Sequence, residues 1–282
     1  MTPTQIKATL EQLGARPNKN LGQHFLIDKT ALEAIVQAAD IKQGDRVLEV
    51  GPGLGVLTHA LLERGAEVVA IEKDRRFAEL MTPLLKVKLS LAHGGGGIVT
   101  GDAAKLEWDE IIGSKPWKFV SNLPYAITSL ALRKALYAKN PPTMVVVLVQ
   151  REVAERVLAR DGKMSLLSLM VGLAVGPENN KNTQIIRRVP AGAFYPPPKV
   201  ESAILSICPM SNVQRQKTWG IEPEEVMAMA KKGFAHPRKL LQRNLGIENG
   251  QWQELSKELG FDLKTRAEDL TIGQWAGLAK IV

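Results

Sequence analysis

Val47-Leu48-Glu49-Val50-Gly51-Pro52-Gly53-Leu54-Gly55 is the stretch that decides the fold. Its first four residues are mostly apolar and favour extended structure, which predicts a short buried strand. The three glycines allow a tight turn that a ligand can approach closely. Leucines at helical spacing follow, so the turn is predicted to open a helix. Strand, glycine turn and helix together indicate a nucleotide-type cofactor site in an α/β sheet.

A second predicted strand, at 68–72, ends in an acid about 20 residues after the first strand. Glu72 is therefore placed to accept hydrogen bonds from both hydroxyls of a ribose. The glycine spacing, G-x-G-x-G, departs from the G-x-G-x-x-G that holds a pyrophosphate, and Glu49 precedes it. An acid there suits a cationic ligand that carries a ribose and an amino acid. S-adenosylmethionine is such a ligand, and a purely structural turn is the alternative.

Two more polar groups follow predicted strands. Asp102 comes just after 97–100, where it would accept a hydrogen bond from a cofactor adenine or, alternatively, cap a helix. Asn122-Leu123-Pro124-Tyr125 follows the strand at 118–121. The Asn122 oxygen and the carbonyl before Tyr125 can accept both hydrogens of an exocyclic amine, which frees the nitrogen lone pair to attack a methyl group. Tyr125 offers a stacking face for the base. A plain strand-end turn is the alternative interpretation.

The second half of the chain adds a proline-rich segment. Residues 144–150 are predicted to form a buried parallel strand, and the apolar run 166–175 is expected to pack on the sheet. Phe194-Tyr195-Pro196-Pro197-Pro198-Lys199-Val200 is held extended by three prolines. It would present Phe194 as a second stacking face and Lys199 to a phosphate, or it is only a stiff hairpin loop. Gly94–Gly97 is predicted to be a flexible surface loop.

The C-terminal region is predicted to be helical. Residues 209–223 are polar and lack periodicity, which is typical of a linker. Helical patterns follow from Glu224, and one helix carries Arg238, Lys239 and Arg243. A solvated basic face is the alternative to an RNA-binding one. We therefore expect domains at 1–210, including an N-terminal segment that covers the cofactor, and at 211–282.

Charge and composition limit the possible functions. The chain has 282 residues, 45% of them hydrophobic, and a formal net charge of +8. Residues 131–212 hold 11 Lys/Arg against 5 Asp/Glu, which favours a polyanion partner or a merely basic surface. Cys208 is the single cysteine, so no internal disulfide is expected. The sequence has no signal peptide, membrane-span or metal-ligand pattern, and we expect a cytoplasmic protein without a bound metal.

Many ordered blocks of the chain resemble the KsgA-type rRNA adenine dimethyltransferases. The blocks are Gly22-Gln23-His24-Phe25-Leu26, 47–55, Ala70-Ile71-Glu72, Gly101-Asp102-Ala103, 122–125, 150–157, 194–202, 238–245 and Arg266-Ala267-Glu268-Asp269-Leu270. The resemblance implies an S-adenosylmethionine-dependent enzyme with a Rossmann-like α/β methyltransferase domain and a small all-helical C-terminal domain. It implies dimethylation of N(6) of two adjacent adenosines near the 3′ end of 16S rRNA, late in assembly of the small subunit.

The resemblance also implies roles for individual residues. Cofactor contacts fall on His24, Leu26, Gly51, Gly53, Glu72, Asp102 and Asn122. The target base would sit between Tyr125 and Phe194, held by Asn122 and the backbone of Leu123 and Pro124. Lys199, Arg238, Lys239 and Arg243 would contact rRNA. The chain departs from the family at 160–166, which lacks a tyrosine common there, and at Pro237, where an arginine is common.

Three other functions remain open from the sequence. One is methylation of a 23S rRNA adenine, as in erythromycin-resistance enzymes, although Leu123 and the long C-terminal match favour the small subunit. Another is an assembly factor that binds precursor 30S particles and rarely turns over. The third is methylation of a small molecule, which the basic segment 131–212 disfavours. The expected partner is 16S rRNA in the 30S subunit or its precursor, bound by a monomer.

Overall fold

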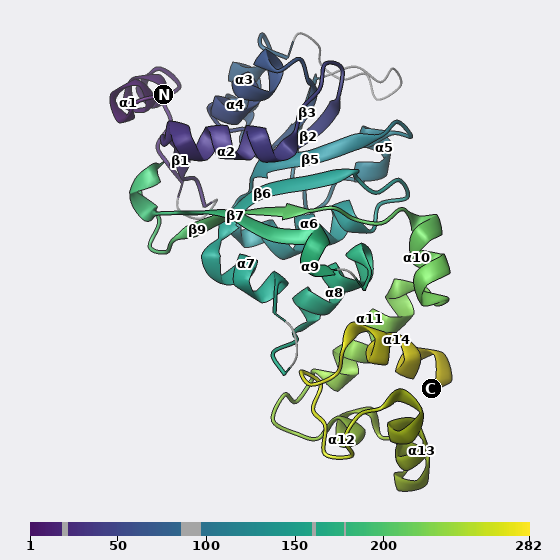
Figure 1. Ribbon diagram of the computed structural model, residues 1–282. Helices are drawn as coiled ribbons and strands as arrows, with labels where there is room; N and C mark the ends of the chain where they lie inside the picture. The colour runs from purple at the N-terminus through teal and green to yellow at the C-terminus, as the bar shows by residue number, and fades with distance from the viewer. Residues whose placement is uncertain (19–21, 86–96, 160–161, 178) are drawn as a thin grey trace. The chain divides into compact units, whose positions relative to one another are not determined.

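The computed structural model describes residues 1–18, 22–85, 97–159, 162–177 and 179–282 (Figure 1). Contacts divide the chain into two compact units, 1–154 with 183–209 and 155–182 with 210–282. The grouping assigns 155–182 to the same unit as the C-terminal helices, and the domain boundaries expected from the sequence stay a prediction. Of the predicted glycine loop, residues 94–96 lie outside the described residues, and Gly97 begins a strand.

The first unit combines a large sheet, a small sheet and surrounding helices. Its strands are β1 (Phe25–Leu26), β2 (Arg46–Val50), β3 (Glu67–Glu72), β4 (Gly97–Thr100), β5 (Trp117–Asn122), β6 (Met144–Gln150), β7 (Thr183–Val189), β8 (Phe194–Tyr195) and β9 (Ser202–Ile207). Its helices are α1 (Pro3–Gln12), α2 (Lys29–Ala39), α3 (Val56–Glu63), α4 (Arg75–Met81), α5 (Trp108–Ile112), η2 (Tyr125–Ile127), α6 (Thr128–Leu136) and η3 (Ala191–Ala193). Helix α7 (Arg151–Val157) spans the boundary between the units.

The large sheet has seven strands in the order β4-β3-β2-β5-β6-β9-β7. Strands β2 to β6 pair in parallel, whereas β9 is antiparallel to both β6 and β7. The strand order reverses direction between β2 and β5, and such a reversal opens a crevice at the carboxyl ends of the strands. The Rossmann-like fold predicted from the sequence is confirmed, and the glycine turn lies at this reversal.

Burial of the central strands on both faces explains their apolar sequences. Residues 145–149 of β6 are fully buried, as expected of a strand covered by helices on each side. Helix α2, labelled in Figure 1, contacts β5, β6, β7 and β9. Its buried residues Ala31, Ile35, Val36 and Ala39 belong to the core. The side chain of Asp28 caps this helix by accepting from the backbone N–H groups of residues 30 and 31.

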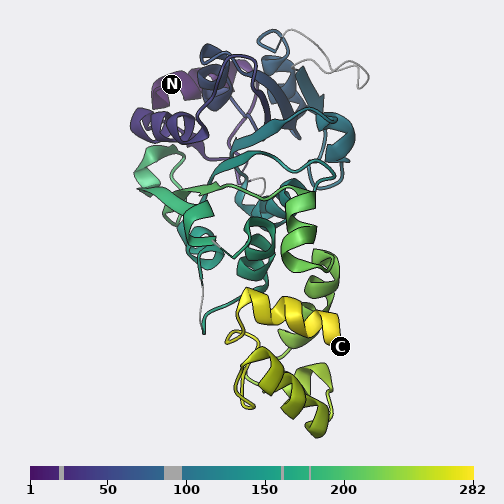
Figure 2. The ribbon, with the colours of Figure 1, turned by 45° about the vertical axis from the view of Figure 1, so that its right-hand side comes forward.

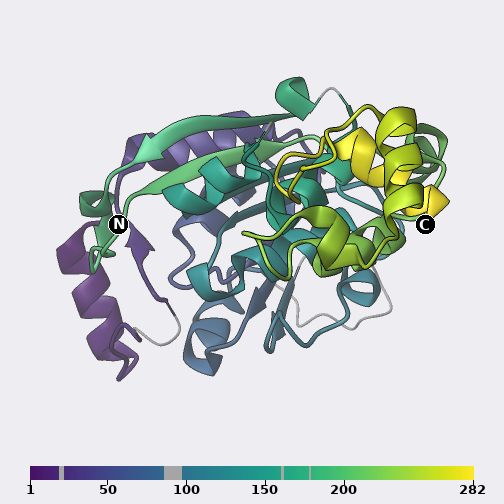
Figure 3. The ribbon, with the colours of Figure 1, turned by 90° about the horizontal axis from the view of Figure 1, so that it is seen from below.

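The small sheet joins two segments that lie far apart in the sequence. Strands β1 and β8 pair antiparallel, with Phe25 opposite Tyr195 and Leu26 opposite Phe194. The N-terminal segment, purple in Figure 3, thus runs beside the green segment that follows β7. Helix α1 packs Ile6 and Leu10 against Phe25 in a separate small core. The proline-rich segment is therefore fixed to the N-terminal segment by main-chain pairing.

The glycine turn has the backbone conformation that the sequence predicted. The φ angles are +73° at Gly51, +56° at Gly53 and +79° at Gly55, all in the left-handed region that favours glycine. Gly55 is the N-cap residue of α3. A Cβ atom at Gly55 would lie 2.6 Å from the sulfur of Met81, so this position is restricted by packing as well as by backbone conformation.

The elements of the second unit are helices (Figure 2). They are α8 (Leu166–Val175), α9 (Asn179–Asn182), α10 (Asn212–Trp219), α11 (Pro223–Gly233), α12 (Leu241–Leu245), α13 (Asn249–Leu259) and α14 (Ile272–Ile281). Their core is built around the buried side chains of Trp219, Trp252 and Trp275. Within the described residues, no helix is both long enough and apolar enough to cross a bilayer.

One expectation about this region is corrected, and another stays a prediction. The apolar run 166–175 forms α8, which contacts α10, α11 and α14 and adds Leu169 and Leu173 to the core of the helical unit; its expected packing on the sheet stays a prediction. The predicted linker 209–223 contains α10, which begins with a capping box in which Ser211 and Gln214 bond reciprocally. Only Arg215 and Trp219 of α10 are buried, which explains why hydrophobic periodicity did not reveal it.

Replacement of Gly55 tests the restriction in the turn. We expect Gly55→Ala to lower the free energy of unfolding by about 1–3 kcal/mol, because alanine is strained at positive φ and its Cβ meets Met81. Gly192→Ala is the matched control, since nothing lies within 4 Å of a Cβ there and φ is not positive. Urea unfolding of both variants measures the difference. Equal stabilities of the two variants would contradict this interpretation.

Candidate functional site

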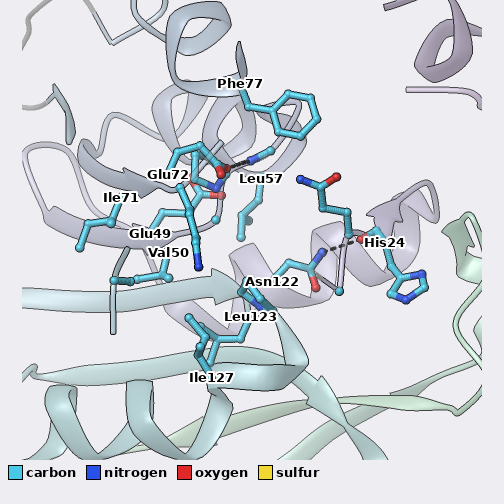
Figure 4. Close-up of a pocket in the computed structure, with 18 of the residues that line it drawn as sticks. His24, Glu49, Val50, Leu57, Ile71, Glu72, Phe77, Asn122, Leu123 and Ile127 are labelled. Carbon is cyan, nitrogen blue, oxygen red and sulfur yellow. Dashed lines mark hydrogen bonds between the residues drawn. The ribbon is translucent and has the colours of Figure 1, made fainter. Parts of the chain in front are cut away.

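A pocket of about 220 Å³ opens where β2 and β5 diverge (Figure 4). Its walls come from the segment at 22–26, the glycine turn, the end of β3, the turn after β4 and residues 122–127. Every residue predicted to bind the cofactor lines it: His24, Leu26, Gly51, Gly53, Glu72, Asp102 and Asn122. So do Leu123, Pro124 and Tyr125. The carboxyl ends of parallel strands thus bring together groups that are up to about 100 residues apart in sequence.

Glu72, at the end of β3, is fixed by main-chain N–H groups. One carboxylate oxygen accepts from Gly53 N at 3.1 Å and the other from Asp74 N at 2.8 Å. Burial raises the pKa of Glu72 above its ordinary value, and the N–H groups of residues 74, 53 and 73 partly oppose that rise. Each oxygen keeps a further lone pair, so the carboxylate can accept from two hydroxyls of a ribose.

Asp102 occupies the turn after β4, next to Glu72 in the sheet. Its Oδ1 atom accepts from Ala104 N at 3.0 Å, and its Oδ2 atom pairs with Lys73 Nζ at 2.9 Å. The Lys73 ammonium lowers the pKa of this carboxyl, so Asp102 is ionised at neutral pH and acts as an acceptor. Asp102 stabilises a local turn and lines the pocket, but it does not cap a helix, because the N-cap residue of α5 is Glu107. Its contact with a cofactor adenine stays a prediction.

Glu49 lies beneath the glycine turn and is almost completely buried. Its exposed fraction is 1%, and its Oε2 atom lies 2.7 Å from the hydroxyl of Thr58 on α3. Burial raises the pKa of Glu49 to about 8, which the Thr58 hydrogen bond opposes and the charge of Glu72 reinforces. The carboxyl is therefore protonated at neutral pH unless a nearby cation compensates its charge.

Asn122 has a defined orientation in the pocket. Its Nδ2 atom donates to the main-chain oxygen of His24 at 3.3 Å (Figure 4). Because this contact uses an N–H of the amide, the Oδ1 atom remains an acceptor for another group. Next to it, the Pro124 carbonyl accepts from Ile127 N at 3.1 Å and retains a second lone pair. Leu123 N donates to Leu148 O at 3.1 Å, which fixes the backbone of the tetrad.

Tyr125 is positioned by one contact of its hydroxyl and one contact of its aromatic ring. Its hydroxyl lies 2.7 Å from the Oγ atom of Ser202, a fully buried residue of β9. Burial raises the pKa of the Tyr125 phenol, so the hydroxyl stays protonated. The His24 ring stacks with it at a centroid distance of 5.8 Å and an interplanar angle of 28°. Sequence patterns gave no sign of this tyrosine–serine pair, since 77 residues separate its members.

The remaining predicted site residues are not among those that line the pocket. Phe194 does not line it; its side chain is 2% exposed and belongs to the main core, where its backbone pairs with Leu26. The predicted sandwich of a base between Tyr125 and Phe194 therefore requires Phe194 to leave this core. Lys199 is exposed in the proline-rich segment. Arg238, Lys239 and Arg243 are exposed in the helical unit.

The chemistry of the lining fits a cationic nucleoside better than a dinucleotide. Three acids line the pocket, Glu49, Glu72 and Asp102, and the one lysine among the described lining residues, Lys73, is paired with Asp102. A pyrophosphate would be repelled by the carboxylates of Glu72 and Asp102, whereas a cation would also favour ionisation of Glu49. The glycine turn is also tightly packed at Gly53, because a Cβ atom there would lie 3.2 Å from Phe25. The residues present therefore suit S-adenosylmethionine.

Comparison with known proteins identifies the family of this chain. The sequence profile described as ribosomal RNA adenine dimethylase matches residues 14–282. The chain belongs to the ribosomal RNA adenine dimethylase family. A family member from Dehalococcoides mccartyi, named ribosomal RNA small subunit methyltransferase A, is 38% identical over 97% of this chain and 91% of its own. The protein of the same name from a Nostoc species is 35% identical over 95% of this chain and 98% of its own.

Solved structures share the fold of this adenine dimethylase. A dimethyladenosine transferase from Plasmodium falciparum has a TM-score of 0.71 and 24% identity, covering 90% of this chain and 96% of its own. The 23S rRNA methyltransferase ErmE has a TM-score of 0.64 and 23% identity, covering 91% and 98%. Both likenesses concern the fold alone.

The buried Glu49 makes stability depend on pH. Its carboxyl holds a proton in the folded protein up to about pH 8 but loses it near 4.5 when unfolded, so folded stability falls as pH rises between these values. We expect the wild type to lose up to about 1.4 kcal/mol per pH unit relative to Glu49→Gln within this window. Urea unfolding of both proteins from pH 5 to pH 8 measures it. Parallel curves would rule out a strongly raised pKa.

Proposed function

We infer that this chain dimethylates adenine bases of small-subunit ribosomal RNA, with S-adenosylmethionine as the methyl donor. Membership in the ribosomal RNA adenine dimethylase family is the observation that carries this conclusion. The pocket supports it, because acceptors for a nucleoside and acceptors for an amine line the same cavity. The proposed target is a pair of adjacent adenosines near the 3′ end of 16S rRNA, modified during biogenesis of the small subunit.

The cofactor-binding residues are proposed from their positions in the pocket. Glu72 would accept from the ribose hydroxyls and Asp102 from the adenine amino group. The glycine turn would pass beneath the amino-acid part of the donor, near the buried Glu49. When bound, S-adenosylmethionine supplies a methyl group on a positively charged sulfur. Acidic surroundings favour this positive charge over the neutral product, which assists binding of the reactive form.

The methyl-accepting residues act on the lone pair of the target nitrogen. In adenine this lone pair is delocalised into the ring, and hydrogen-bond acceptance by Asn122 Oδ1 and the Pro124 carbonyl would draw the nitrogen toward tetrahedral geometry. Tyr125 would stack on the base and hold it there. The amine becomes acidic once it is methylated, so no strong general base is required. Positioning and hydrogen-bond acceptance would therefore supply most of the rate.

Exposed basic side chains of the helical unit are proposed to contact rRNA. Arg238 and Lys239 lie in the turn before α12, and Arg243 lies within α12. The Nδ2 atom of Asn244 donates to the carbonyls of Gly233 and His236, which fixes this turn. Because the backbone of this turn is already fixed, it loses little conformational entropy when its side chains contact phosphates. A cytoplasmic monomer acting on the 30S subunit or its precursor completes the proposal.

Mass spectrometry of rRNA adenosines tests the function directly. After incubation with isotope-labelled S-adenosylmethionine, we expect two labelled methyl groups on each of two adjacent adenosines of 16S rRNA from unmethylated 30S particles. Free 23S rRNA is the control substrate and should remain unlabelled. Labelling of 23S rRNA alone would instead indicate an enzyme of the erythromycin-resistance type. Particle binding without any labelling would instead favour the assembly-factor alternative.

Salt dependence of 30S binding tests the basic turn. Each phosphate contact contributes about 0.7–0.9 to the slope of log K against log salt. We expect the slope of the triple variant Arg238→Ala/Lys239→Ala/Arg243→Ala to fall by about 2–3. The matched control removes three exposed lysines of the same unit, Lys217, Lys257 and Lys280, and should change the slope by less than about 1. Equal changes in both variants would mean that only net charge matters.

A further inference from the structure

His24 uses its main chain and its side chain for different contacts. Its carbonyl oxygen accepts from Asn122 Nδ2, as described above. Its imidazole contacts Pro196 and Tyr125. We propose that this imidazole is a positioning residue for Tyr125, the ring that receives the target adenine, and that it does not bind the cofactor. This inference rests on the proposed function and departs from the cofactor role that the family resemblance implies for His24.

The contact with Pro196 determines that Nδ1 of the His24 ring carries a proton. Nδ1 of His24 lies 2.7 Å from the Pro196 carbonyl oxygen. A carbonyl oxygen only accepts, so Nδ1 must carry the proton, and in the neutral ring Nε2 is unprotonated. The ring is therefore held in one tautomer by a main-chain group of the proline-rich segment.

The position of this bond follows from the small sheet. In the β1–β8 register, Phe25 lies opposite Tyr195 and Leu26 opposite Phe194, so His24 and Pro196 come directly after the last paired residues. Proline has no N–H to donate to a continued main-chain ladder. The His24 side chain adds a contact beyond the ladder by donating to the Pro196 carbonyl. The ring is thereby tied to the end of the ladder that joins the N-terminal segment to the proline-rich segment.

The stacking contact with the His24 ring restricts the orientation of the Tyr125 ring. With its hydroxyl bonded to Ser202 and the His24 ring stacked beside it, Tyr125 loses most of its torsional freedom before any substrate binds. A base that stacks on a fixed ring is delivered to Asn122 with a defined tilt and distance. Small errors in such placement reduce the rate of the chemical step much more than they reduce binding.

Three substitutions separate the two contacts of the ring. His24→Phe keeps a stacking ring but loses the donor to Pro196, His24→Asn keeps a donor but loses the ring, and His24→Ala loses both. We expect His24→Ala to lower kcat on 30S particles by about 10- to 100-fold at saturating cofactor. The dissociation constant for S-adenosylhomocysteine, measured by calorimetry, should change by no more than about twofold. His24→Phe and His24→Asn should each restore part of kcat.

The tautomer provides a readout independent of activity. The chain has four histidines, and nitrogen-15 NMR of labelled histidine should show one ring with a protonated Nδ1 whose signal disappears in His24→Asn. His59→Asn, at an exposed position of α3, is the control and should leave both that signal and kcat unchanged.

Several results would overturn the inference. One is a loss of S-adenosylhomocysteine affinity of about tenfold or more in His24→Ala with kcat retained, which would make the ring a cofactor contact. Another is a protonated Nε2 with a bare Nδ1 at His24. A third is an active wild type whose three variants are equally active. An inactive wild type with the expected tautomer would instead contradict the proposed function and leave the ring contacts intact.

Discussion

The left-handed backbone of the turn at Gly51, Gly53 and Gly55 is the constraint on which the site depends. It lets the chain turn tightly between β2 and α3 at the carboxyl ends of the strands. Gly53 N is thereby directed at Glu72, and this hydrogen bond joins the first two strands of the site. A side chain at these positions would be strained and would crowd Pro124, Phe25 or Met81.

The large sheet supplies only part of the site. The N-terminal segment and the proline-rich segment supply the rest. Strands β2, β3, β4 and β5 supply the glycine turn, Glu72, Asp102 and Asn122 at one edge. The N-terminal segment then closes over this edge, because it pairs with β8 and its main chain accepts from Asn122. The same pairing brings the proline-rich segment beside Tyr125. The proposed donor-binding and base-binding walls consequently share one small sheet, so displacement of either segment would disturb both.

Sequence reasoning recovered features that depend on local patterns. The glycine turn, the parallel strands and the acids at strand ends each follow from residue types at short spacing, and all of them were found where predicted. Helix α10 was missed, although Ser211 and Gln214 have the spacing of a capping box, because only two of its residues are buried. Local signals of this kind can be read from the sequence once they are sought.

Long-range features could not be predicted in the same way. The side chain of Phe194 faces the core because β8 pairs with β1, and no local pattern reveals which face of a two-residue strand is buried. Helix α8 is apolar on all sides, so its sequence could not specify which neighbours each of its faces contacts. The contacts of His24 with Pro196 and of Tyr125 with Ser202 join residues that are 172 and 77 positions apart.

A crystal structure with S-adenosylhomocysteine and an adenosine analogue tests the central claim most directly. We expect the ribose hydroxyls within hydrogen-bonding distance of Glu72 and the adenine amino group of the cofactor at Asp102. The sulfur should be directed at a nitrogen held by Asn122 and Pro124. A cofactor bound elsewhere on the chain, or a sulfur turned away from the asparagine, would contradict it.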